Sequence, residues 1–271
     1  MFQYSALAIE DEVKAEDYDV DTAWGKAVSK VPQVTLVFWV IKILATTLGE
    51  TGGDSVSMSL KLGYLVATAI FAAFFAAAVV YQILAKRFHP IVYWVTIIAT
   101  TTVGTTLADF ADRSLGIGYA GGSLLLFGLL IVSLAAWYRS EGSISVSTVC
   151  TPKVEVFYWV TIMFSQTLGT ALGDWTAGSA GLGYRGGAIV FSGLLLLVAG
   201  AYYRTKISRT TLFWAAFILT RPLGAVVGDF LDKPLSSGGL ALSRYTASAV
   251  LLGIMALGIW RFPQTSAEEC H

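Results

Sequence analysis

The chain has 271 residues, of which 55% are hydrophobic and 13% are charged, and its formal net charge is zero. This charged fraction is about half that of an average soluble domain, which argues against a soluble globular protein. The absence of a basic excess argues against nucleic acid as a partner. The lipid bilayer is therefore the surroundings that the composition fits.

The first 30 residues differ from the rest because they are acidic and weakly apolar. A basic stretch followed by an apolar run, as in a cleavable signal peptide, is missing from them. Low hydropathy and high charge favour a flexible tail outside the bilayer, either simply solvated or binding a partner. The seven carboxylates of this segment are Glu10, Asp11, Glu12, Glu16, Asp17, Asp19 and Asp21.

Long apolar runs make up most of the remaining chain. Residues 62–84, for example, contain no charged side chain, and about 20 apolar residues are needed to cross about 30 Å of hydrocarbon as a helix. We predict an all-α polytopic membrane protein with a membrane domain at 31–262 and a short tail at 263–271. The eight predicted transmembrane helices are 33–49, 62–84, 91–108, 119–138, 154–173, 186–203, 211–228 and 239–260.

Basic residues are unevenly divided between the two sides of this topology. Ten flank the side of the termini and five lie in the opposite loops, so the positive-inside rule puts both termini in the cytoplasm. A multi-pass protein of the bacterial inner membrane is expected. The first group is Lys26, Lys30, Lys86, Arg87, Arg139, Lys153, Arg204, Lys206, Arg209 and Arg261; the second is Lys61, Arg113, Arg185, Lys233 and Arg244.

An aromatic–Trp pair recurs four times along the chain, and the Trp residues stand 55, 65 and 55 positions apart. This spacing predicts a two-helix unit that was duplicated twice, with repeats at about 31–87, 88–142, 151–208 and 209–262. An aromatic belt at the membrane interface is the ordinary explanation for the Trp residues. The four pairs are Phe38-Trp39, Tyr93-Trp94, Tyr158-Trp159 and Phe213-Trp214.

Two further positions are the same in every repeat. Glycine stands ten residues after each Trp and aspartate fifteen residues after it, about 22 Å along a helix. Because the odd helices carry these polar residues, we expect them to line a central axis with the even helices outside. Because the four repeats differ in sequence, we do not expect them to form a closed, symmetric ring. The positions are Gly49, Gly104, Gly169, Gly224, Asp54, Asp109, Asp174 and Asp229.

These motifs carry a resemblance. With "LGETGGD" (48–54), "GTTLADFADRSLG" (104–116), "LGDW" (172–175) and "GDFLDKPLSSGGL" (228–240), the chain resembles a bacterial family of uncharacterised membrane proteins with four tandem two-span repeats, each marked by a Trp. The likeness covers about residues 30–262 and implies the repeat and the topology, but no activity. Repeat three departs from the pattern, because Ala177 stands where repeats two and four have Asp112 and Asp232.

Carboxylates cluster where the odd helices end, and hydroxyl groups precede them. Oxygen-rich surroundings suit hard cations or protons, and charges near a bilayer are costly enough to suggest function. For a metal ion, Glu50 and Asp54 are the best candidates; no cofactor is expected. The predicted ion- or substrate-binding residues are Lys42, Glu50, Asp54, Asp109, Asp112, Asp174, Arg221, Asp229 and Asp232.

Three of these features occur in one repeat alone. Lys42 and Glu50 lie in the first predicted helix, and Arg221 precedes Pro222 in the seventh. A proline in mid-helix removes a backbone hydrogen bond, so we expect a broken helix, which often marks a binding site in transporters. Two buried cations could neutralise carboxylates or bind an anion.

We therefore expect a membrane transporter or channel for a small ion, with a cation or a proton-coupled cation as the favoured substrate. The alternative is a non-transporting scaffold or sensor, in which each Asp pairs with a basic residue, for example Asp174 with Arg185. Replacing Asp174 by Asn should then destabilise the fold, whereas Glu50→Gln should leave folding nearly intact and alter flux.

An enzyme is not expected, because no catalytic constellation occurs. "GIGYAG" (116–121) and "GLGYRG" (181–186) match G-x-G-x-x-G, but the dinucleotide fingerprint needs a preceding strand, and here each motif opens a membrane helix. A homo-oligomer is compatible with the sequence.

Overall fold

The computed structural model describes residues 29–85 and 87–267. These residues form eight long α-helices, and a single turn of π-helix directly follows three of them: Ser55–Ser59, Phe110–Ser114 and Trp175–Ser179. The long helices are α2 (Leu36–Asp54), α3 (Tyr64–Leu84), α4 (Pro90–Asp109), α5 (Tyr119–Glu141), α6 (Pro152–Asp174), α7 (Gly183–Arg204), α8 (Arg209–Asp232) and α9 (Arg244–Arg261).

Six of these helices, in the described part of the chain, are long and apolar enough to cross a membrane: α2, α3, α4, α5, α7 and α8. The expected all-helical, multi-pass membrane protein is confirmed at this level. The two remaining helices fall short of that measure; α6 carries Lys153 and Glu155 in its first turn, and α9 has an arginine at each end.

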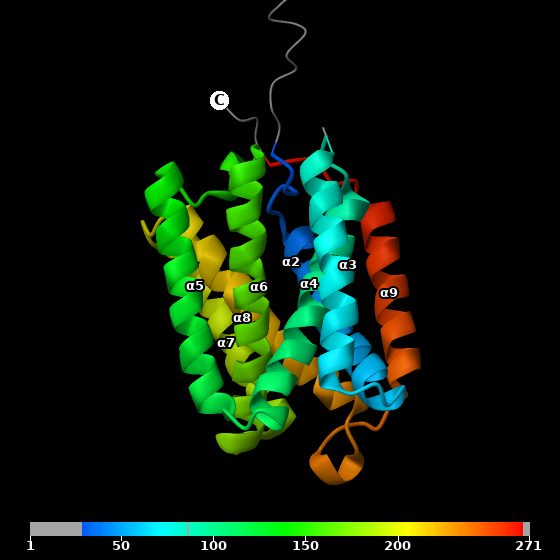
Figure 1. The fold of residues 1–271 in the computed structure, drawn as a ribbon. Coiled ribbons are helices and arrows are strands. Elements are labelled where there is room, and N and C mark those ends of the chain that lie inside the picture. The colour runs from blue at the N-terminus through cyan, green and yellow to red at the C-terminus, as the bar shows by residue number, and fades with distance from the viewer. Residues whose placement is uncertain (1–28, 86, 268–271) are drawn as a thin grey trace, which may run out of the picture.

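Four inner helices form a closed ring in the order α2, α4, α6 and α8, and α8 packs back on α2. One outer helix covers each of them (Figure 1), and it comes from the preceding repeat: α3 packs on α4, α5 on α6, α7 on α8, and α9 on α2. The four repeats form a closed ring although their sequences differ. Each outer helix packs on the inner helix of the next repeat, so that every repeat is held to its neighbour.

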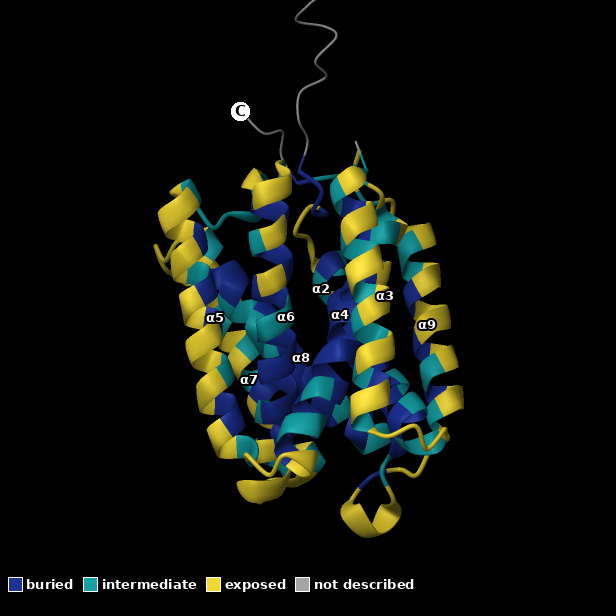
Figure 2. Cartoon of the chain, in the orientation of Figure 1, coloured by how far each residue is buried: buried dark blue, intermediate teal, exposed yellow. Residues whose placement is uncertain are grey.

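Burial separates the two sets of helices, as Figure 2 shows. Between 61% and 72% of the apolar windows of α2, α4 and α8 are buried, against 11% to 22% for α3, α5 and α7. The polar residues predicted to avoid lipid therefore lie on the buried inner helices. The largely apolar outer helices present their side chains to the surroundings.

An aromatic layer closes one end of the ring. It consists of the residues that precede each Trp: Phe38, Tyr93, Tyr158 and Phe213. The hydroxyl groups of Tyr93 and Tyr158 are hydrogen-bonded to each other at 2.7 Å.

The interpretation of the repeated Trp residues as an aromatic belt at the membrane interface was wrong for three of the four. Trp94, Trp159 and Trp214 are at most 4% exposed, because they pack into the same core as the aromatic layer. The Trp94 indole donates to Gln264 and that of Trp214 to the carbonyl of Ile144. Tyr81, Tyr202, Tyr203 and Trp260 of the outer helices are exposed, as residues of an aromatic belt would be, whereas Trp137 is buried.

The two ends of the described chain lie together at this end of the ring. Pro32 and Ser266 form an isolated antiparallel bridge. Lys30, at the edge of the expected tail, is buried, and its ammonium lies 2.6 Å from the fully buried carboxylate of Glu155. Residues 1–28 of that tail lie outside the described residues.

Candidate functional site

Close contacts between the inner helices bring the site residues together. In each repeat, the glycine that follows the Trp by ten residues packs against the inner helix of the next repeat. It meets that helix at the residue that follows its own Trp by seven positions. A Cβ added at Gly49 would lie 2.5 Å from Thr101 Cβ, and one at Gly104 would lie 2.9 Å from the backbone of Gln166. A Cβ added at Gly169 would clash with Arg221 in the same way, and one added at Gly224 would clash with Thr46. Glycine is therefore required here for helix packing.

Arg221 lies at the centre of the ring and is fully buried. From α8, its Nη2 donates to Glu50 Oε2 on α2 at 2.9 Å, to Thr105 Oγ1 on α4 at 2.6 Å and to Thr170 Oγ1 on α6 at 2.5 Å. One side chain thus connects all four inner helices. Its three acceptors share one repeat position, eleven residues after the Trp, where repeat four has Ala225.

The predicted break at Pro222 was wrong, because α8 runs as one helix from Arg209 to Asp232. Pro222 packs against Gly169 and Gly173 of α6. On the other side, Thr46 of α2 donates to the carbonyl of Thr220. Neighbouring helices hold the chain helical through the proline, as is common in membrane helices.

Lys42 is fully buried inside the ring. Along the axis of the ring, it lies about one helical turn away from Arg221. Its Nζ lies 4.1 Å from the centre of the Phe217 ring, and Phe217 precedes Arg221 by one turn of α8. Among the described residues its Nζ has no hydrogen-bond partner. The face of the Phe217 ring is a favourable neighbour for this amino group when it is protonated. Glu50 of the same helix, α2, is paired with Arg221.

Three carboxylates at the other end of α2 and α8 form what we call the acidic cluster: Asp54, Asp229 and Asp232. All three are buried, and one oxygen of each lies within 4.8 Å of the others. Lys233 contacts Asp54 and Asp229, and the Arg244 Nε lies 2.8 Å from Asp232 Oδ2. Of the two metal candidates from the sequence, Asp54 belongs to this cluster and Glu50 does not.

Lys233 remains charged in these surroundings. Its burial lowers the pKa of the ammonium, but the carboxylates of Asp229 and Asp54 raise it by more, so that the pKa lies above its ordinary value. The acidic cluster therefore holds a cation supplied by the protein itself.

Arg113 makes the corresponding link on the opposite side of the ring. It lies 3.0 Å from Asp109 on its own helix and 3.6 Å from Asp174 on α6. The partner that we expected for Asp174, Arg185, lies over the ring of Phe230 instead, at 5.2 Å. Asp112 is buried beside Gly122, and its oxygens have no hydrogen-bond partner in the described ranges.

The family described as Repeat of Unknown Function (DUF347) matches the chain four times, at residues 37–88, 92–143, 157–208 and 212–266. The chain belongs to this family. Each DUF347 match spans one inner helix and the outer helix that follows it, so the expected fourfold two-helix repeat is confirmed. The chain matches no curated protein and no solved structure. Since the family description names no activity, function has to be argued from the residues.

The four DUF347 repeats together carry more carboxylates than cations in and beside the ring. Within the described residues, each of the nine residues predicted from the sequence lies buried there. Only two of these nine are basic. The acidic side chains are Glu50, Asp54, Asp109, Asp112, Asp174, Asp229 and Asp232, seven in all; the basic side chains are Lys42, Arg113, Arg221, Lys233 and Arg244, five in all. Acidic side chains therefore outnumber basic ones by two, and protons or a bound cation can neutralise this difference.

Sequence reasoning missed some partners in the site. Thr105 and Thr170 bind Arg221, and their alignment with Glu50 at one position of the DUF347 repeat is the signal that could have identified them. The buried pair of Lys30 and Glu155 had no such signal, because neither residue recurs in the other repeats.

Proposed function

We propose that this protein is a proton-coupled carrier for a small cation, and that the cation binds at the acidic cluster. One observation carries the proposal: three buried carboxylates within 4.8 Å of one another, at one end of a ring of polar inner helices. Carboxylate oxygens are the ligands that hard cations take in proteins.

In the proposed cycle, Lys233 substitutes for the transported ion. An arriving cation displaces the ammonium from Asp54 and Asp229, and Lys233 returns when the cation leaves. The charge of the acidic cluster thereby stays nearly constant, which limits the cost of each state. The excess of carboxylates over cations supplies groups that take up or release protons.

A carrier fits these residues better than an open channel does. The Arg221–Glu50 pair crosses the middle of the ring, and the aromatic layer closes its far end. A transported ion would have to pass both, so access would alternate between the two sides as the inner helices move.

Exchange of Lys233 for a cation leads to a stability prediction. Lys233→Met should destabilise the protein by about 3 kcal/mol or more, because it leaves the buried Asp229 without its ion-pair partner and Asp54 with only the longer contact to Arg244. A divalent cation at about 100 times its dissociation constant should return about 2.7 kcal/mol. Thermal unfolding in detergent, with a panel of divalent cations, measures both effects.

Arg113→Met is the matched control, because it removes the cation between two carboxylates, Asp109 and Asp174, which no third carboxylate of the described residues joins within 4.8 Å. It should lose stability and gain little from divalent cations. Equal rescue of both variants, or of neither, would contradict a selective site at the acidic cluster. In liposomes, the wild-type protein should move at least one cation together with a pH change inside.

We further propose that both termini are cytoplasmic and that the protein resides in the bacterial inner membrane, in accord with the distribution of basic residues. With Cys150 and Cys270 replaced by serine, a cysteine at the exposed Ser236 should react with an impermeant maleimide in intact cells, and one at Arg87 should react only after lysis. The reverse pattern would overturn this orientation.

The second candidate is a non-transporting scaffold or sensor, favoured by the observation that the ion pairs join different helices. Lys233 links α8 to Asp54 on α2, and Arg113 links α4 to Asp174 on α6. Absence of flux for every cation, together with loss of stability in both variants without rescue, would support this function instead.

A further inference from the structure

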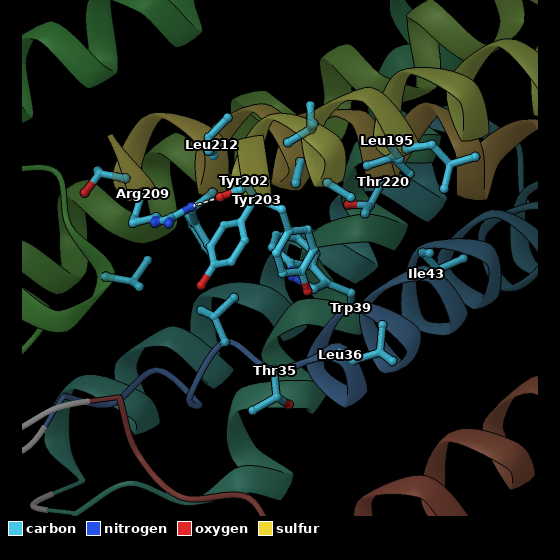
Figure 3. A pocket seen from close by; sticks show the side chains of 18 of the residues that line it. Thr35, Leu36, Trp39, Ile43, Leu195, Tyr202, Tyr203, Arg209, Leu212 and Thr220 are labelled. Atoms are coloured by element: carbon cyan, nitrogen blue, oxygen red, sulfur yellow. Dashed lines mark hydrogen bonds between the residues drawn. The ribbon is translucent and has the colours of Figure 1, made fainter. Parts of the chain in front are cut away.

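An apolar groove of about 730 Å³ lies between α2, α7 and α8, away from the acidic cluster. Figure 3 shows Leu36, Trp39 and Ile43 of α2 facing Leu195 and Tyr202 of α7 across it. Several of its side chains are strongly exposed, including Leu36, Leu196 and Tyr203. The groove therefore opens on the surface that the membrane covers.

The groove is long enough for an acyl chain. Its lining on α8 runs from Arg209 to Leu223, fourteen positions that rise about 21 Å in a helix. One leaflet supplies about half of the roughly 30 Å of hydrocarbon in a bilayer. A lipid tail that enters beside Arg209 would be covered along its whole depth.

One end of the groove is positively charged. Arg209, the first residue of α8, lies 3.8 Å from the ring of Tyr202 and donates from Nη1 to its carbonyl. Arg204, the last residue of α7, and Lys206, in the connection that follows, are both exposed, and no acidic residue occurs between 204 and 209. Basic groups at the membrane surface beside an apolar cleft suit an anionic head group.

We propose that this groove binds one anionic phospholipid, with an acyl chain along α7 and α8 and the phosphate at Arg209. The groove spans the seam between α2 and α8, which belong to the first and the last repeat. No chain segment directly connects these two helices. A bound lipid would therefore hold α2 and α8 together at the one junction of the ring that the chain does not link covalently.

Titration of the full-length protein in detergent tests this proposal. Phosphatidylglycerol should raise the unfolding temperature and remain bound in native mass spectrometry, whereas phosphatidylcholine with the same acyl chains should bind more weakly. Arg209→Gln should weaken binding of phosphatidylglycerol about fivefold, as expected for one basic side chain near a membrane surface. Ala199→Trp, which fills the groove, should abolish the preference between the two lipids.

Two controls match these variants. Ala136→Trp places the same bulk on an exposed position of α5, five residues before its end as Ala199 is in α7, and Arg261→Gln removes an exposed arginine at the end of α9. Both should bind phosphatidylglycerol as the wild-type protein does. Equal binding of the two lipids, unchanged binding in Ala199→Trp, or full stabilisation by inorganic phosphate alone would overturn the proposal.

Discussion

Replacing Arg221 by methionine is expected to destabilise the protein by about 3–5 kcal/mol, because it leaves a buried carboxylate without its partner. Glu50 is only 3% exposed, and Arg221 is its ion-pair partner in the structure. The same substitution also removes the donor to Thr105 and Thr170. Thermal or denaturant unfolding in detergent measures the loss.

The double variant Arg221→Met/Glu50→Gln separates a broken pair from lost packing. It should be more stable than Arg221→Met alone, since no charge is left unpaired. Glu50→Gln by itself should now also destabilise, contrary to the expectation from the sequence, because Arg221 then lacks a counter-charge. If the double variant is as unstable as the sum of the two single ones, the pair is not the source of the effect.

Gly224→Ala is expected to destabilise by about 1–3 kcal/mol, as overpacking of a close interface does. The added methyl group would lie 2.6 Å from Thr46 Cβ and 2.8 Å from the Thr46 backbone carbon. Because the backbone of α2 cannot yield locally, α2 and α8 would have to move apart. The contacts of Arg221 with Glu50 would be disturbed as well, so, if the protein is the carrier that we propose, loss of flux should accompany the loss of stability.

Gly200→Ala provides the control for this prediction. Gly200 also lies inside a helix, but an added Cβ meets nothing within 4 Å. Alanine should therefore be neutral or stabilising by about 0.5–1 kcal/mol, the ordinary gain in helix propensity. If both glycine variants change stability in the same direction and by the same amount, close packing at Gly224 is not what the glycine provides.

The sequence alone was sufficient for features that depend on local composition. The length of the apolar runs predicted eight helices. The spacing of the four Trp residues predicted the fourfold repeat, which the family match confirms. Polarity sorted the inner from the outer helices, since a residue such as Arg221 is too costly to place in lipid. The nine predicted site residues are buried for the same reason.

Only the tertiary structure decided which charges pair. Glu50 and Arg221 are separated by 171 positions, and Asp54 and Lys233 by 179. Each pairing depends on which inner helices are neighbours and on how each helix is rotated about its axis. One residue turns the helical direction by about 100°, so Asp174 meets Arg113 although Arg185 is nearer in sequence. Partner choice is a property of the assembled ring and leaves no mark in any single repeat.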